Sequence, residues 1–239
     1  MIYIPDVHGR SFWKDAVTEK EEGELVVFLG DYMEPYGYEG ITHEDAYNMF
    51  LEVIEYKKEH MDEVVLLLGN HDFACIDREM ISCRHDYKNH ERNQKLYLDN
   101  LHLFEIGHKT VVNGKTYIAT HAGILPEWIK EFKQVAMVNF KDEEIIEYMN
   151  RLLHENYKML LPGLGIVGRS RGGYSYYGSC VWADVSEHVY RPSSKLFDNT
   201  YQVFGHTQLR ENAIFDNDFA CLDCRAGFRL TDKGEFIKL

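Results

Sequence analysis

Polar side chains that could bind metal ions follow five separate apolar segments of this chain. In LLLGNHDFAC at 66–75, an apolar run stops at a glycine, and an amide, an imidazole and a carboxylate follow without a spacer. The same arrangement recurs in PDVHG at 5–9, GDYME at 30–34, THAG at 120–123 and FGHTQ at 204–208. Carboxylate, imidazole and amide-oxygen ligands without thiolate suit Mn, Fe, Zn or similar ions.

The number of these side chains favours two metal ions over one. Six protein ligands are too many for a single catalytic ion that must keep coordination positions open, whereas a bridging carboxylate would let two ions share them. Each motif alone has an ordinary structural explanation, such as a helix cap after a strand. All of them together, in this order, predict a dinuclear site. The predicted ligands are Asp6, His8, Asp31, Asn70, His121 and His206.

The elements that must position these ligands alternate between strand and helix in the first half of the chain. MIYIP, ELVVFLG and EVVLLLG are apolar runs of strand length, and the segments 11–21 and 42–60 have helical patterns, the second with Thr42 as its N-cap. Continuous apolar runs are typical of parallel strands buried on both faces. Because ligands bind beyond the carboxyl ends of such strands, we expect the polar groups to gather there.

The second half of the chain predicts an antiparallel or mixed sheet. Asn113-Gly114 is a strong hairpin signal, and helices are expected at about 126–131 and 141–161. Two sheets face to face with helices outside are the natural architecture for such a pattern. Short strands are expected near 174–182, 201–204, 213–215, 219–222, 227–230 and 235–238.

Composition limits the functional classes. The 239 residues, of which 45% are hydrophobic and 27% charged, suit one soluble domain over 1–239. Lys and Arg total 26 against 39 Asp and Glu, a net charge of −13 that argues against DNA and membrane-surface partners. No secretory signal is evident, and no apolar stretch approaches the ~18 residues of a membrane helix. Five cysteines suit reduced thiols, so we expect a cytoplasmic protein.

These motifs, in this order, resemble the calcineurin-like metallophosphoesterase superfamily. They are most similar to its branch of Ser/Thr protein phosphatases, bacterial and phage phosphatases and diadenosine tetraphosphatases. The resemblance runs from residue 4 to about residue 228. It implies an α/β fold, a four-layer α/β/β/α sandwich of two mixed β-sheets flanked by helices. It also implies two divalent metal ions as cofactors, with Mn²⁺ favoured and Fe, Zn, Ni or Mg as alternatives.

The resemblance assigns a role to each motif residue. Asp6 and His8 would bind one ion, Asp31 would bridge both, and the remaining predicted ligands would complete the second. His71 would be the general acid that protonates the leaving oxygen. Glu34 would orient it, since a carboxylate partner favours the protonated imidazole.

Two departures from the family pattern concern arginine. The branch usually has an arginine directly after the acid of its second motif, where this chain has Pro35. Many relatives also carry W-x-R, where this chain has Asp184 after Trp182-Ala183. Arg171, which lies in SRGGY, is the leading candidate to supply the missing phosphate-binding guanidinium, and Arg169 and Arg191 are the others. We interpret His85 and His90 as surface or rim residues.

The resemblance predicts a hydrolase of phosphate monoesters of the Ser/Thr protein phosphatase kind. The substrate would be a phosphoprotein, a small phosphate ester or a nucleotide. A hydrolase of dinucleoside polyphosphates is the alternative, and a non-catalytic scaffold of the same fold is the third. The physiological substrate, the metal and the oligomeric state stay open.

Overall fold

The computed structural model describes residues 1–190 and 195–239, and the chain divides into two compact units. Unit 1 comprises residues 1–104 and 225–239, and unit 2 comprises residues 105–224. Each unit is built around one β-sheet. The single domain expected over 1–239 stays a prediction.

Unit 1 holds a mixed sheet with strand order β11-β10-β1-β2-β3-β4. The strands β1, β2 and β3 pair in parallel, and β10 pairs antiparallel with both β1 and β11. Every residue of the three parallel strands is buried, as their continuous apolar sequence predicted. The strands are β1 (Ile2–Ile4), β2 (Val26–Phe28), β3 (Val64–Leu67), β4 (Phe104–Glu105), β10 (Phe228–Leu230) and β11 (Phe236–Lys238).

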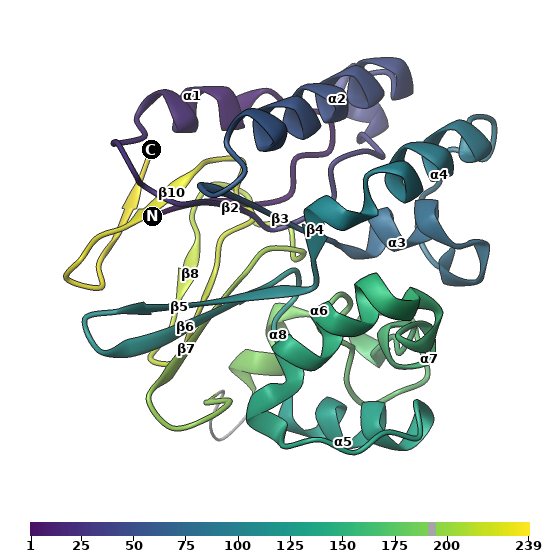
Figure 1. Cartoon of the computed structure of the whole chain (residues 1–239), viewed down its shortest axis with the longest axis vertical. Coiled ribbons are helices and arrows are strands. Elements are labelled where there is room, and N and C mark those ends of the chain that lie inside the picture. Colours follow the sequence, from purple (N-terminus) through teal and green to yellow (C-terminus); the bar gives the residue numbers. More distant parts are fainter. Residues whose placement is uncertain (191–194) are drawn as a thin grey trace. The chain divides into compact units, whose positions relative to one another are not determined.

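Helices of unit 1 connect these strands, and α1 and α2 lie along one face of the sheet (Figure 1). The helix α2 begins with the predicted cap, because the Thr42 hydroxyl accepts the Asp45 backbone N–H at 3.0 Å. Its buried face includes Phe50, which stacks on Tyr32 with ring centroids 4.8 Å apart. The helices are α1 (Phe12–Thr18), α2 (His43–Glu59), α3 (Asn70–Ile76) and α4 (His90–Asp99), with 3₁₀ turns at Gly37–Glu39, Arg78–Met80 and Leu101–Leu103.

Unit 2 holds a second mixed sheet with strand order β5-β6-β7-β9-β8. The strands β6, β7 and β9 run parallel, while β5 and β8 are antiparallel edge strands. The expected hairpin at Asn113-Gly114 joins β5 to β6. The strands are β5 (Gly107–Val112), β6 (Lys115–Thr120), β7 (Thr200–Phe204), β8 (Ile214–Phe215) and β9 (Phe219–Cys221).

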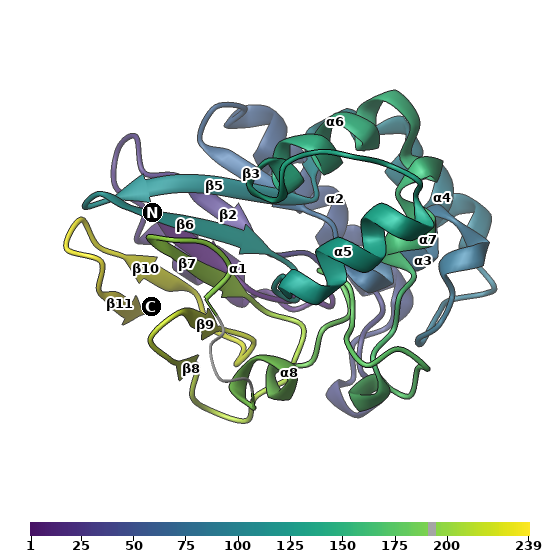
Figure 2. The same cartoon turned by 90° about the horizontal axis from the view of Figure 1, so that it is seen from below.

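The helices α5, α6 and α7 of unit 2 lie near one another beyond the ends of β5 and β6 (Figure 2). Asn150 of α6 accepts the Ile106 backbone N–H at 2.7 Å and so ties this helix to the start of β5. The helices are α5 (Pro126–Val135), α6 (Ile145–Asn156), α7 (Leu161–Leu164) and α8 (Val185–Val189), with 3₁₀ turns at Asp142–Glu144, Tyr157–Met159 and Arg169–Arg171.

The strand predicted near 174–182 is wrong. That segment is made of turns, with a single isolated bridge between Gly168 and Ser175. Gly178 within the segment and Gly173 directly before it leave no room for a side chain: a Cβ on Gly173 would lie 2.0 Å from the Val167 carbonyl oxygen, and one on Gly178 would lie 2.5 Å from Trp182 backbone atoms. Such close backbone approaches favour tight turns over a strand.

The remaining elements confirm the predicted α/β class of two mixed sheets with flanking helices. Among the described residues, no helix has the length and apolar character needed to cross a bilayer.

Candidate metal site

Three of the predicted strand ends meet in unit 1. The ligand atoms of His8, Asp31 and His71 all lie within 4.8 Å of one another, and the three residues are buried. His8 Nε2 lies 3.7 Å from Asp31 Oδ2, and the His71 backbone N–H donates to Asp31 Oδ1 at 2.9 Å. These residues follow β1, β2 and β3, so the carboxyl ends of the parallel strands do gather the polar groups.

The imidazole of His8 has the form that a metal ligand requires. Its Nδ1 lies 2.9 Å from the Met33 carbonyl oxygen, and since a carbonyl only accepts, the ring proton is on Nδ1. Nε2 then presents its lone pair toward Asp31. Burial lowers the pKa of His8 to about 3, against the attraction of the Asp31 carboxylate. The ring is therefore neutral at neutral pH, and no proton has to be displaced when an ion binds.

Backbone strain concentrates at the same loops. His8, Asp31 and Glu34 have φ values of 46°, 55° and 64°, in the left-handed region that residues other than glycine seldom adopt. Next to His8, Gly9 has φ of 76°, and a Cβ there would lie 2.7 Å from the Ala46 Cβ. Strain of this kind persists where surrounding contacts fix it, and it is typical of functional sites.

Asp72, which has no place among the predicted site residues, supplies those contacts. Its buried carboxylate accepts the backbone N–H groups of Asp31 at 2.7 Å and Tyr32 at 3.1 Å. It also accepts the Gly69 N–H at 2.7 Å and the Tyr97 hydroxyl at 2.5 Å. Burial and the Asp31 charge raise the pKa of Asp72 to about 7. The helix-cap explanation of GNHD thus holds for Asp72, which also joins the loops after β2 and β3.

Asp6 and Asn70, the other predicted ligands of unit 1, are buried beside these loops. Asp6 lies two residues after the end of β1. Its backbone carbonyl accepts a hydrogen bond from Arg10 Nη1 at 3.2 Å. Asn70 is the first residue of α3, directly before His71. Unit 1 therefore places four predicted ligands on three consecutive strand ends.

Glu34 supports His71 through an intermediate segment. The orienting contact expected from Glu34 on His71 stays a prediction. The Glu34 carboxylate accepts the Asp86 backbone N–H at 2.9 Å, and its Oε1 lies 3.6 Å from His85 Nδ1. The Arg84 carbonyl then accepts from His71 Nδ1 at 3.1 Å. Residues 84–86 thus contact both the Glu34 carboxylate and the His71 imidazole.

The side chains of His85 and His90, which were expected to be surface or rim residues, are buried. The His85 side chain is fully buried, His90 is 2% exposed, and His85 Nε2 lies 2.8 Å from His90 Nδ1. Together with Glu34 and Cys75, His85 forms a second group of closely spaced ligand atoms. Burial and the Glu34 charge raise the pKa of the Cys75 thiol well above its usual value, so it is a protonated donor 3.9 Å from Glu34 Oε1. Burial also raises the pKa of Glu34. Sequence gave no signal for this cluster.

In unit 2, the two predicted histidine ligands lie side by side. His121 and His206 follow the parallel strands β6 and β7, and the distance from His121 Nε2 to His206 Nδ1 is 3.1 Å. The Gly205 backbone N–H donates to the His121 carbonyl at 2.8 Å, which fixes the spacing of the two loops. His206 is again left-handed, with φ of 62°.

The arginines singled out in the sequence lie in unit 2, and Arg191 falls outside the described residues. Arg171 Nε forms an ion pair with Asp184 Oδ2 at 2.9 Å. Its Nη2 donates to the Thr207 hydroxyl at 2.8 Å and to the His206 carbonyl at 3.4 Å. Arg169 stacks over the Tyr176 ring, with Cζ 4.1 Å from the ring centroid. Arg171 is therefore beside a predicted ligand, but a carboxylate balances its charge.

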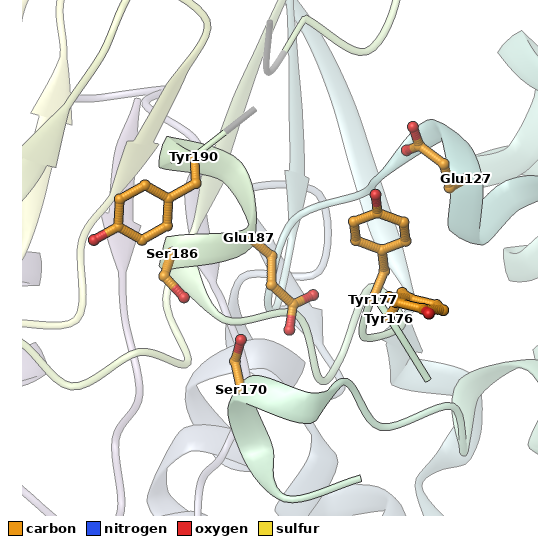
Figure 3. Close-up of a pocket in the computed structure, with 7 residues that line it drawn as sticks. All are labelled: Glu127, Ser170, Tyr176, Tyr177, Ser186, Glu187 and Tyr190. Atoms are coloured by element: carbon orange, nitrogen blue, oxygen red, sulfur yellow. The ribbon is translucent and has the colours of Figure 1, made fainter. Parts of the chain in front are cut away.

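A pocket of about 330 Å³ in unit 2 contains none of the predicted ligands. Figure 3 shows the Glu187 side chain in the middle of this pocket. Its carboxylate accepts the Gly178 backbone N–H at 2.7 Å, and burial raises its pKa. An acidic lining is unsuited to a phosphate group, so the chemistry is not expected here. The pocket is lined by Glu127, Ser170, Tyr176, Tyr177, Ser186, Glu187 and Tyr190.

Comparison with known families gives one match that covers most of the chain. A family model described as calcineurin-like phosphoesterase matches residues 4–209, which include all six predicted ligands. No curated protein matches the sequence significantly.

Solved phosphatase structures share the fold at low sequence identity. The cold-active protein-tyrosine phosphatase of the psychrophile Shewanella sp. matches with a TM-score of 0.59 and 16% identity, covering 100% of this chain and 79% of that chain. A protein serine/threonine phosphatase from Saccharomyces cerevisiae matches with a TM-score of 0.52 and 11% identity, covering 100% and 78%. At these identities the likeness is evidence for the fold.

Proposed function

Because the chain belongs to the calcineurin-like phosphoesterase family and is thus a metal-dependent phosphoesterase, we propose that it hydrolyses phosphate monoesters with two metal ions. The observation that carries the proposal is in unit 1, where His8, Asp31 and His71 converge from three strand ends. A neutral imidazole beside a buried carboxylate is a donor set that suits divalent ions such as Mn²⁺.

The proposed ligand set follows from the sequence motifs. In unit 1 it comprises Asp6 and His8 for one ion, Asp31 for both, and Asn70 for the second, and in unit 2 it comprises His121 and His206. The residues fit this role chemically, since the pKa of His8 is lowered and His8 and Asp31 are both buried. When bound, two divalent ions lower the pKa of a water molecule and hold the phosphate oxygens.

His71 is the proposed general acid. The Arg84 carbonyl accepts the proton on Nδ1, which leaves Nε2 as the nitrogen that can pass a proton to the leaving oxygen. The same carbonyl oxygen also stabilises the protonated His71 ring, because its partial negative charge faces the Nδ1–H of the imidazolium. Glu34 contributes by holding residues 84–86.

A dinucleoside polyphosphate or another nucleotide is the alternative substrate. One observation favours it. The Tyr36 ring centroid lies 5.0 Å from that of His8 and 5.5 Å from that of Tyr38, and the Tyr38 side chain is 70% exposed. An exposed aromatic ring such as that of Tyr38, beside a phosphate site, can stack on a base.

A substrate panel separates these proposals. Protein stripped by chelation and then loaded with Mn²⁺ is assayed on p-nitrophenyl phosphate, phosphopeptides, bis-p-nitrophenyl phosphate and diadenosine tetraphosphate. We expect metal-dependent hydrolysis of the monoesters at a higher kcat/KM than of the diester. Preference for diadenosine tetraphosphate would establish the nucleotide alternative. Absence of metal-dependent hydrolysis on the whole panel would contradict the proposed activity.

A further inference from the structure

The position after Glu34 lacks the guanidinium that the family pattern places there, and unit 1 supplies one from elsewhere in its sequence. We propose that Arg84 binds the substrate phosphate in place of the arginine replaced by Pro35. This inference rests on the proposed phosphoesterase function and names a residue that neither the motifs nor the family match assigns.

Arg84 is attached to the loop that carries the missing position. Its Nη2 donates to the Glu34 carbonyl at 2.7 Å, one residue before Pro35. Its guanidinium lies over the Tyr36 ring, with Cζ 3.8 Å from the ring centroid. These two contacts hold the Arg84 side chain against residues 34–36, next to the backbone position that the family pattern gives to an arginine.

The same loop places Arg84 next to the candidate chemistry. The Tyr36 ring that carries the guanidinium lies 5.0 Å from the His8 ring, in an edge-on arrangement. The Arg84 carbonyl accepts from His71 Nδ1. Arg84 thus contacts the proposed acid through its backbone carbonyl, and its guanidinium lies on a ring that is itself in contact with the candidate ligand His8.

Glu34 fixes the backbone on both sides of this arrangement. Its carbonyl accepts from Arg84, and its carboxylate accepts the Asp86 backbone N–H and lies 3.6 Å from His85 Nδ1. Three consecutive residues, 84–86, are therefore anchored to one buried side chain and its carbonyl. Glu34 therefore links the Arg84 side chain to the segment that contacts His71.

Charge compensation distinguishes Arg84 from its neighbours. The Arg10 guanidinium is used by a two-pronged pair with Glu39, at 2.9 and 3.1 Å, and Arg225 also pairs with Glu39 at 2.9 Å. Arg84 is exposed, and it forms no ion pair with a carboxylate of the described residues, although its charge favours the ionised form of the buried Glu34 carboxyl group and so acts to lower its pKa. Its N–H donors other than the one on Glu34 remain available to an anion. A planar guanidinium of this kind suits two oxygens of a phosphate dianion.

The test uses inorganic phosphate and a monoester with the Mn²⁺-loaded full chain. Arg84→Ala should weaken phosphate binding, measured by calorimetry, and raise KM for p-nitrophenyl phosphate by about 10- to 100-fold, the scale of a charge-assisted hydrogen bond. Arg84→Lys keeps the charge without the fork and should show an intermediate loss. Arg78→Ala removes an exposed arginine from the same connection between α3 and α4, and should bind phosphate as the wild type does.

Arg84→Ala keeps the carbonyl that holds His71, so the pH profile of kcat should keep its shape. Phosphate affinity within about twofold of wild type, or a shifted pH profile with unchanged KM, would overturn the phosphate-binding role. If the alanine variant does not fold, judged by circular dichroism, unchanged phosphate affinity in Arg84→Lys would overturn it equally. A wild-type chain that hydrolyses nothing contradicts the proposed function, while calorimetry with phosphate still decides the role of Arg84.

Discussion

In unit 1, buried carboxylates hold the backbone around the candidate ligands, whereas in unit 2 hydroxyl groups do so. Asp72 accepts three backbone N–H groups across the loops after β2 and β3. In unit 2, the Thr120 hydroxyl accepts the Gly123 N–H at 3.1 Å, and the Thr207 hydroxyl accepts the Val185 N–H at 3.0 Å. A buried carboxyl group that accepts several N–H groups makes a stiffer support than a single hydroxyl, and its removal costs more free energy because several donors lose their acceptor together.

The two units also differ in how they treat arginine. Arg171 of unit 2 is paired with Asp184, so little of its positive charge remains for a ligand. Arg84 of unit 1 is held by a carbonyl and an aromatic ring, neither of which cancels its charge. Under the proposed function, unit 1 would supply the carboxylate ligands, the acid and the anion-binding group, and unit 2 would supply two imidazole ligands.

The largest difference is expected between the metal contents of a ligand variant in unit 1 and a ligand variant in unit 2. Asp31→Asn in unit 1 is expected to lose both ions and to lower kcat/KM for monoesters by about 10³-fold or more, or roughly 4 kcal/mol of transition-state stabilisation. His121→Asn in unit 2 should lose about one ion per chain. Inductively coupled plasma mass spectrometry on dialysed protein measures both. Equal metal loss in the two variants would contradict the proposal that Asp31 binds both ions while His121 binds one.

Removal of the proposed general acid of unit 1 should give the next largest effect. His71→Ala should slow hydrolysis of alkyl phosphates by about 10²- to 10⁴-fold, the usual range for a positioned acid. Aryl phosphates, whose leaving groups need less protonation, should lose less. Steady-state kinetics on a leaving-group series measures the difference, with metal content as the control. A uniform loss over the series would show that His71 does not protonate the leaving oxygen.

Loss of a backbone-supporting carboxylate should lower the free energy of unfolding more in unit 1 than in unit 2. Asp72→Asn puts an amide where several N–H donors converge, leaving at least one of them unpaired, and should lower the free energy of unfolding by about 2–4 kcal/mol. Asp184→Asn in unit 2 is the matched change, since Asp184 caps α8 through the Ser186 N–H at 2.9 Å. That cap and a partly exposed ion pair are worth about 1 kcal/mol. Urea denaturation of the metal-free proteins compares the two, and equal losses would contradict the carboxylate-support interpretation.

The smallest effect is expected for Arg171. Because Asp184 balances its charge, Arg171→Ala should raise KM for monoesters by less than about fivefold, near 1 kcal/mol. Asp184→Asn should lower KM slightly by releasing the guanidinium. Steady-state kinetics on p-nitrophenyl phosphate measures both changes. If Arg171→Ala weakens phosphate binding more than Arg84→Ala does, the anion-binding role belongs to unit 2.

The sequence by itself determined the main elements and the types of candidate ligand. Apolar runs identified β1, β2 and β3, and Thr42 and Asn113-Gly114 identified a helix start and a hairpin, because these signals are local. Ligand-type residues directly after the strands were predictable for the same reason. Parallel strands in one sheet necessarily bring their carboxyl ends to one edge.

Tertiary structure alone decided how the loops support those residues. Arg84 reaches Glu34 across 50 positions, and Asp72 reaches Asp31 across 41. His85 and His90 are buried because of what covers them, and the segment 174–182 turns where backbones approach closely. No periodicity or spacing encodes such contacts, since each depends on which distant groups the packed chain brings within hydrogen-bond distance.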